Sequence, residues 1–167
     1  MNRIPFAWED TSSLASELLQ PIYKLSIESV FPRSIIQYVT LWRVDGSGIR
    51  LFSEMHDVAE RLEVGILKFE KVTALPKWEC FVETIDLAFA FQHDLKVFKL
   101  VIEESGTLAE SGIEIMASDG SAIVIVASGL PCNLEVQGVK VAAKLEGPEY
   151  PLEDYQRELV TEPPPLS

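Results

Sequence analysis

The stretch VTLWRVDGSGIRLFS, residues 39–53, places two apolar runs rich in β-branched and aromatic residues on either side of Asp45-Gly46. An Asp-Gly pair between such runs is typical of a β-hairpin, because both residue types tolerate the positive φ angles that tight hairpin turns need. A second pair, Asp119-Gly120, lies between the apolar runs 113–117 and 123–127. The sequence therefore predicts two hairpins, one in each half of the chain.

Alternation of apolar and polar residues predicts further strands around both hairpins. The predicted strands are 22–28, 39–44, 49–53 and 62–69 in the first half, and 97–103, 113–117, 123–127 and 134–141 in the second. The last strand of each half changes its apolar phase at a glycine, Gly65 and Gly138, as a β-bulge would require.

Two segments carry helical signals. Residues 13–20 contain helix formers, with two leucines four residues apart on one face, a polar N-cap candidate at each of residues 11–13 and Pro21 as the stop. Residues 76–94 carry apolar side chains at both helical and alternating spacing, and we predict a helix there.

The second half of the chain matches the first at three places in the same order. Residues 24–28 (KLSIE) match 99–103 (KLVIE), 45–47 (DGS) match 119–121, and 62–64 (LEV) match 134–136, at offsets of 75, 74 and 72 residues. Trp8 and Trp78 stand upstream of the two matched KL strands. One such match is expected by chance, but three in order favour duplication of one unit. The doubled Glu28 and Glu103 are expected to be solvated strand ends.

We therefore predict an all-β or β-dominated α+β fold. It consists of two tandem copies of an antiparallel β-meander unit, packed as a sandwich or barrel, with a short helix leading each unit, because one meander cannot bury its apolar face alone. Residues 1–161 form a single duplicated domain, with repeat 1 at about 8–72 and repeat 2 at about 78–145, followed by a disordered Pro-rich tail at 162–167. The expected core comprises Leu25, Ile27, Leu41, Leu51, Leu100, Ile102, Ile113, Ile115, Ile123 and Ile125.

Charge and apolar content restrict the partners and the location. The chain has 26 Asp and Glu against 14 Lys and Arg, a net charge of −12. This charge repels phosphate backbones and anionic membranes, so we expect neither nucleic acid nor membrane as a partner. The first ten residues do not resemble a signal peptide, and the longest apolar stretch, 122–127, is far shorter than the ~20 residues that span a bilayer. We expect a soluble, cytoplasmic protein.

Candidate reactive residues are few. His56 with Glu54 and Glu60 has the residue types of a weak metal cluster, but a solvated polar loop is the favoured interpretation, and His93 is expected in a turn. Cys132 is the better candidate for an exposed thiol nucleophile, whereas Cys80 has the surroundings of a core residue. The spacing of the two cysteines fits a reducing compartment and leaves open whether they form a disulfide.

The sequence contains no P-loop, GxGxxG, GxSxG, HExxH or EF-hand motif. We therefore predict no catalytic, cofactor-binding or metal-ligating residue and no cofactor. The favoured function is a non-enzymatic, acidic interaction protein that binds a basic protein partner through its acidic surface or an exposed sheet edge. A small-ligand carrier with an apolar cavity is the alternative, a hydrolytic enzyme is the third hypothesis, and a sheet edge also permits a homo-oligomer.

Overall fold

β-Strands account for most of the chain in the computed structural model, which describes residues 2–10, 12–31, 34–128, 132–138 and 151–162. The strands are β1 (Asn2–Ile4), β2 (Ala7–Trp8), β3 (Lys24–Phe31), β4 (Ser34–Trp42), β5 (Gly48–Ala59), β6 (Leu62–Val72), β7 (Phe81–Asp86), β8 (Lys96–Glu104), β9 (Thr107–Met116), β10 (Ala122–Ala127), β11 (Leu134–Gly138) and β12 (Gln156–Leu159). The helical elements are α1 (Leu14–Leu18) and the 3₁₀ turns η1 (Phe89–Gln92) and η2 (Leu152–Asp154). The predicted dominance of β structure is confirmed.

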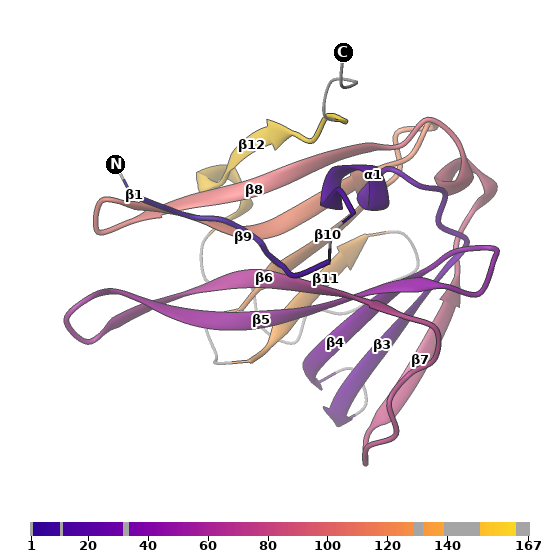
Figure 1. The fold of residues 1–167 in the computed structure, drawn as a ribbon, viewed down its shortest axis with the longest axis horizontal. Coiled ribbons are helices and arrows are strands. Elements are labelled where there is room, and N and C mark those ends of the chain that lie inside the picture. The colour runs from indigo at the N-terminus through magenta and orange to yellow at the C-terminus, as the bar shows by residue number, and fades with distance from the viewer. Residues whose placement is uncertain (1, 11, 32–33, 129–131, 139–150, 163–167) are drawn as a thin grey trace.

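The strands form one curled sheet with the shape of a half-barrel (Figure 1). β3 to β6 make one antiparallel meander and β8 to β11 make another. The two meanders join where Ile36 of β4 pairs with Leu134 of β11. β7 extends the first meander beside β3, and β12 extends the second beside β8. The core is thus enclosed by one curved sheet.

Both predicted hairpins are confirmed. In the first loop the Gly46 N–H donates to the carbonyl of Arg43, and the φ angles of Gly46 and Gly120 are both 87°. The carboxylates of Asp45 and Asp119 each accept a hydrogen bond from the backbone N–H two residues later. In each loop the glycine takes the left-handed conformation that follows a tight turn in three-residue hairpin loops.

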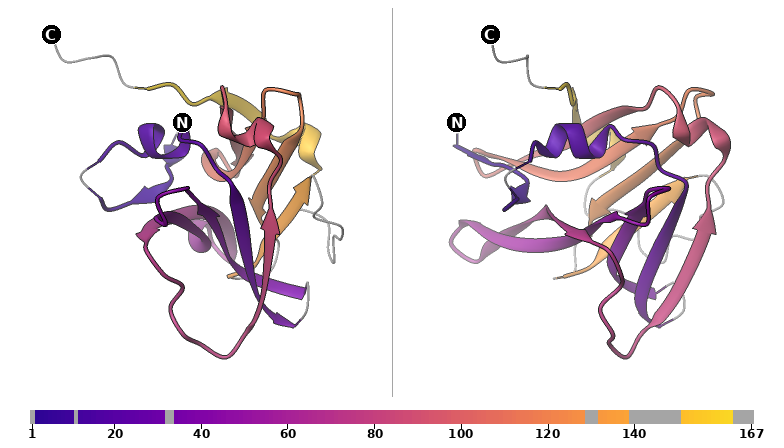
Figure 2. Two further views of the ribbon diagram at one scale, coloured as in Figure 1. Left: turned by 90° about the vertical axis from the view of Figure 1, so that its right-hand side faces the viewer. Right: turned by 45° about the vertical axis from the view of Figure 1, so that its right-hand side comes forward.

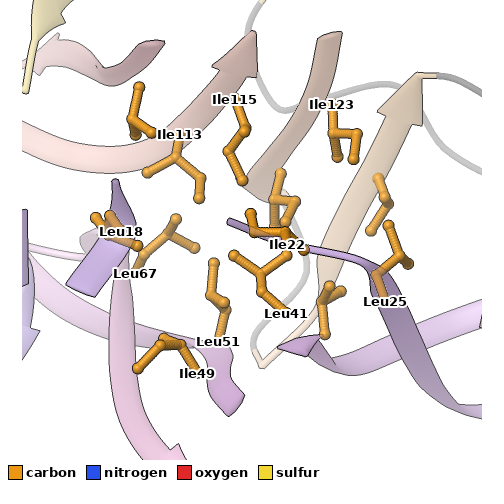
Figure 3. Close-up of a cluster of buried hydrophobic side chains, with 14 of the residues drawn as sticks. Leu18, Ile22, Leu25, Leu41, Ile49, Leu51, Leu67, Ile113, Ile115 and Ile123 are labelled. Atoms are coloured by element: carbon orange, nitrogen blue, oxygen red, sulfur yellow. The ribbon is translucent and has the colours of Figure 1, made fainter. Parts of the chain in front are cut away.

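The ten predicted core residues are all buried, each at most 4% exposed. They divide between two clusters, however. The main cluster lies inside the curl of the sheet and includes Leu25, Leu51 and Ile113 (Figure 3). Leu100 and Ile102 belong instead to a second cluster, on the other face of the β8–β10 region. Since both faces of β10 are apolar, this strand contributes to both clusters.

The two meanders have the same strand order, but the matched side chains have different surroundings. Leu25 and Ile27 of β3 face the main cluster, whereas the matched Leu100 and Ile102 of β8 face the second. Outside the meander, β3 pairs with β7 and β8 pairs with β12. The β8–β9 register also shifts next to Leu100, where the adjacent residues Leu100 and Val101 pair with Gly112 and Glu110. The tandem repeat therefore stays a prediction.

Gly65 does not mark the predicted β-bulge. The register between β5 and β6 runs without a shift through the Met55–Gly65 pair. Before its short pairing with β2 at Lys68 and Phe69, the edge of β6 instead touches the second meander, where the Ser111 hydroxyl donates to the Gly65 carbonyl at 2.5 Å. A Cβ at position 65 would lie 2.7 Å from the Ala127 Cβ. The glycine is thus explained by close approach of two strands, and the phase change by burial of both faces of β6. β11 pairs regularly with β10 up to Gly138, and the residues after it lie outside the described residues, so the phase change predicted at Gly138 stays a prediction.

Helix α1 lies within residues 13–20, the first segment predicted to be helical. Its N-cap is Ser13, whose hydroxyl accepts from the Ser16 N–H. Glu17 fixes the helix to the sheet through ion pairs with Arg43 and with Lys71, the latter at 3.1 Å. Burial alone would raise the pKa of the Glu17 carboxyl, but the hydrogen bonds from these two cations outweigh it and lower that pKa.

The helix predicted for residues 76–94 is wrong, because this segment forms strand β7 followed by the 3₁₀ turn η1. The segment follows the alternating pattern because β7 pairs with β3. This pairing buries the side chains of Ile85 and Leu87 in the core. Phe89 and Phe91 end on opposite sides of the turn, 70% and 0% exposed. The leading element of the second meander is therefore a strand and a 3₁₀ turn.

Three predicted segments extend beyond the described residues. The predicted strand 134–141 and the second repeat, ending at about 145, are described only as far as Gly138. Residues 163–167 of the predicted tail also lie outside the described residues. Among the residues that the structure describes, no helix is long and apolar enough to cross a membrane.

Candidate functional site

Strand β7 forms an open edge of the sheet. It pairs antiparallel with β3 from the Lys24–Asp86 pair to the Ser29–Phe81 pair, and within the described residues no second strand pairs with it. Figures 1 and 2 show β7 at the margin of the sheet. An open edge presents backbone N–H and C=O groups without strand partners, which makes β7 the candidate binding element.

Large apolar side chains are exposed at one end of this edge. Phe81 is 52% and Val82 51% exposed, on opposite faces of β7. Phe31, 57% exposed, ends β3 two residues beyond Ser29, the partner of Phe81. Three exposed apolar side chains at one end of an open strand are characteristic of a protein-binding surface rather than of a solvated edge.

The same edge is acidic. Glu79 and Asp86 are exposed and Glu83 is half-buried, whereas Lys77 is the only basic residue in 76–87. The edge therefore offers carboxylates beside exposed apolar groups, which suits a partner that carries both basic and apolar side chains.

A buried ion pair holds the segment that leads into β7. The Trp78 indole N–H donates to the Glu28 carboxylate at 2.7 Å, and this carboxylate also accepts from Arg50 at 3.1 and 3.2 Å. The Arg50 guanidinium lies 3.5 Å from the centre of the Tyr38 ring and 3.3 Å from the Glu70 carboxylate. We call these five side chains the outer cluster, since they lie on the face opposite the main core. The prediction that Glu28 is a solvated strand end is wrong, because the outer cluster buries it, while Glu103 is exposed as expected.

The outer cluster is poorly suited to catalysis. Glu28 is 1% and Arg50 5% exposed, and both are engaged by each other, so neither reaches a substrate. Cys80 lies beside them, and burial together with the Glu28 carboxylate raises the pKa of its thiol, against the opposing influence of Arg50. A raised pKa disfavours the nucleophilic thiolate. We infer that the outer cluster positions the segment before β7, through the hydrogen bond from Trp78 to Glu28.

The predicted metal candidates do not converge. Glu54 and His56 lie on one face of β5, not in a loop, with their side chains 3.1 Å apart. Glu60 lies in the turn at the end of the β5–β6 hairpin. Within the described part of the chain no group of three His, Cys, Asp or Glu residues is placed to hold a metal ion.

The remaining reactive candidates are also separate. Cys132 is exposed and has a positive φ of 61°, and both Cys132 and Cys80 are free thiols. The ring of His93 packs against Phe89 at 4.3 Å between centres, beyond the end of η1. The structure therefore pairs neither cysteine with a histidine in the way a thiol nucleophile requires.

A second buried carboxylate ties the N-terminus to the sheet. Glu110, 2% exposed, accepts from Arg3 at 2.6 and 2.8 Å, from Lys99 at 3.1 Å and from the Phe6 N–H at 2.9 Å. No local pattern marks Glu110 in the sequence, since Arg3 and Phe6 lie 107 and 104 positions away and Lys99 lies 11 away on the neighbouring strand. With its acceptors occupied by fixed donors, Glu110 is a structural group.

Two surface grooves contain cations that are already paired. One groove, of about 390 Å³, includes Lys68 and Lys71, and the other, of about 270 Å³, includes Arg43 and Lys71. Lys71 lies 3.1 Å from Glu17 and 3.4 Å from Asp10, and Arg43 also pairs with Glu17. We assign no ligand to either groove, because the cations that would hold an anion are neutralised from within the chain.

No protein-family model, curated protein or solved structure matches the chain.

Proposed function

We propose that the protein is a non-enzymatic binding protein that recognises a basic protein partner through the edge of β7. The observation that carries this proposal is the combination of an open strand edge with exposed Phe81 and Val82 and with the carboxylates of Glu79, Glu83 and Asp86. Apolar contacts supply binding energy when they are desolvated, and the carboxylates select a partner of opposite charge.

The overall charge supports the same partner. A net charge of −12 attracts a basic protein at long range and raises its association rate. Between exposed charges this attraction is screened beyond a Debye length of ~8 Å at physiological salt. Association should therefore slow clearly between low and moderate salt, while dissociation changes less.

We also propose that the two meanders derive from one duplicated unit and that the protein acts in the cytoplasm. The duplication is supported by the three ordered sequence matches and by the common strand order of β3–β6 and β8–β11. The cytoplasmic location is supported by the two free cysteines, since thiols persist in reducing compartments.

The test compares two double charge reversals of equal size. Glu79→Lys with Asp86→Lys changes the β7 edge, and Glu60→Lys with Glu63→Lys changes exposed carboxylates near the tip of the β5–β6 hairpin. Each variant captures proteins from native lysate at low and at moderate salt, and the recovered proteins are then purified and bound individually. We expect basic proteins on the wild type and on the hairpin variant, and at least about tenfold slower association for the β7 variant.

Three results contradict the proposal. Equal association rates for both variants would show that the partner does not bind at β7. A small molecule that co-purifies with the protein, without any basic partner at low salt, would favour the carrier. Self-association that the β7 reversal abolishes would favour a homo-oligomer through the sheet edge.

A further inference from the structure

The unpaired backbone groups of β7 belong to three alternate residues. The Leu87 N–H donates to the Tyr23 carbonyl at 2.9 Å, so position 87 faces β3. Backbone groups of successive strand residues point to opposite sides, and the pairing with β3 shows no register shift. The N–H and C=O of Val82, Thr84 and Asp86 therefore point away from β3, toward the open side.

Apart from the two acidic side chains of Glu83 and Asp86, this edge lacks the features that normally prevent strand addition. β7 spans six residues and contains neither proline nor lysine. The other terminal strands of the described sheet order are shorter, with four residues in β12 and two in β2. Short strands, charged lysines, prolines and bulges are the usual protection of sheet edges. Among the strands that end the described sheet, β7 is thus the longest and the best suited to accept another strand.

We propose that the basic partner binds by adding a strand to β7, antiparallel to it, opposite Val82, Thr84 and Asp86. This inference rests on the proposed function and specifies its binding mode. Antiparallel addition continues the β3–β7 arrangement and is slightly more stable per residue than parallel pairing.

The side chains of β7 define the sequence pattern of the added strand. Residues directly opposite each other share a face of the sheet. A basic residue fits opposite Asp86 and another opposite Glu83, and apolar residues fit opposite Ile85, Val82 and Phe81. In the chain direction of the added strand, the pattern is basic, apolar, polar, basic, apolar, apolar.

A second copy of this chain fits the edge less well than a basic partner. Each copy carries a charge of −12, so two copies repel each other as they approach. The β7 sequence FVETID contains two carboxylates and no cation to place opposite them. Charge complementarity thus selects a basic strand.

The probe is a capped hexapeptide with the sequence lysine, valine, threonine, lysine, valine, valine, titrated into the full chain at low salt and followed by NMR. In the proposed register its threonine N–H faces β7 and the N–H of its second lysine faces solvent. One peptide is N-methylated at the threonine and a matched control at the second lysine. We expect the first methylation to weaken binding about tenfold or more and the second to leave affinity within about twofold.

Two protein variants test the same contact from the other side. Thr84→Pro removes an outward N–H without removing a bond to β3, and Thr84→Val keeps that N–H while losing the same hydroxyl contact with Ser26. We expect Thr84→Pro to lose about tenfold in affinity relative to Thr84→Val, and bound peptide to slow amide exchange at Val82, Thr84 and Asp86 in the wild type.

The outcomes separate the binding mode from the function. If the peptide binds the wild type but neither methylation changes its affinity, strand addition is wrong while binding to a basic partner stands. If a hexapeptide with glutamates in place of both lysines binds equally well, selection of the partner by charge is wrong. If no peptide binds and no basic protein is captured, both proposals are overturned. The methylated peptides use the wild-type chain, so the test holds even if Thr84→Pro fails to fold.

Discussion

Replacing Glu28 by alanine removes the centre of the outer cluster. Glu28 is 1% exposed and accepts three hydrogen bonds, two from Arg50 and one from Trp78. The substitution leaves the Arg50 guanidinium, only 5% exposed, without its main counter-charge. It also releases the indole that holds the segment before β7.

The magnitude follows from what Arg50 retains. Breaking a buried ion pair by removing one partner costs about 3–5 kcal/mol when the other charge is left uncompensated. Arg50 still has Glu70 at 3.3 Å and the Tyr38 ring at 3.5 Å, which offset part of this cost. We therefore expect the free energy of unfolding to fall by about 2–3 kcal/mol.

Urea unfolding followed by circular dichroism measures this loss. With an m-value of about 2–3 kcal/mol per molar urea, the midpoint should fall by roughly 1 M. Glu70→Ala is the matched control, because this carboxylate contacts the same Arg50 but its side chain is 44% exposed. Removal of the Glu70 carboxylate should lower the free energy of unfolding by no more than about 1 kcal/mol. Replacing Glu28 and Arg50 together by methionine should recover much of the stability.

A Glu28→Ala midpoint equal to that of Glu70→Ala would refute the reasoning, since burial would then make no difference to the ion pair. Loss of stability in the double methionine variant equal to that in Glu28→Ala would also contradict it, because the cost would then not come from an uncompensated charge.

Two further predictions concern the turns and the helix. Gly46→Val and Gly120→Val should each lower the free energy of unfolding by about 1 kcal/mol or more, since both residues have φ of 87° and an added Cβ has no neighbour within 4 Å, so backbone strain is the main cost; unchanged urea midpoints would contradict this. Because the folded-state pKa of Glu17 lies below the ordinary 4.5, its contribution to stability is present above that pH and is lost as the pH falls through the folded-state pKa. Glu17→Gln should therefore be less stable than the wild type at pH 7, with a gap that narrows below pH 4.5; a gap independent of pH would exclude this linkage.

Local patterns in the sequence were sufficient for much of the fold. The Asp45-Gly46 and Asp119-Gly120 turns depend only on a few neighbouring residues, and both adopt the expected conformation. Alternation identified ten buried side chains correctly, because the period of two is a property of any strand with one apolar face. Ser13 as a helix cap is equally local.

The errors arise where a second segment of the chain decides between two compatible local patterns. Residues 76–94 carry both periods, and pairing of β7 with β3 selects the strand. The local pattern predicts a bulge at Gly65, whereas contact with Ser111, 46 positions away, explains the glycine. Neither partner can be identified from the local sequence.

The sequence by itself determined which segments become strands around the two turns, the burial of the ten predicted apolar side chains and the acidic net charge. Only the tertiary structure decided that Glu28 is buried against Arg50 and Trp78, residues 22 and 50 positions away, and that β7 is left as an open edge. The physical reason is range: turn geometry and strand alternation are set by neighbouring residues, whereas burial of a charge and the pairing of a strand edge depend on which distant segments the curled sheet brings together.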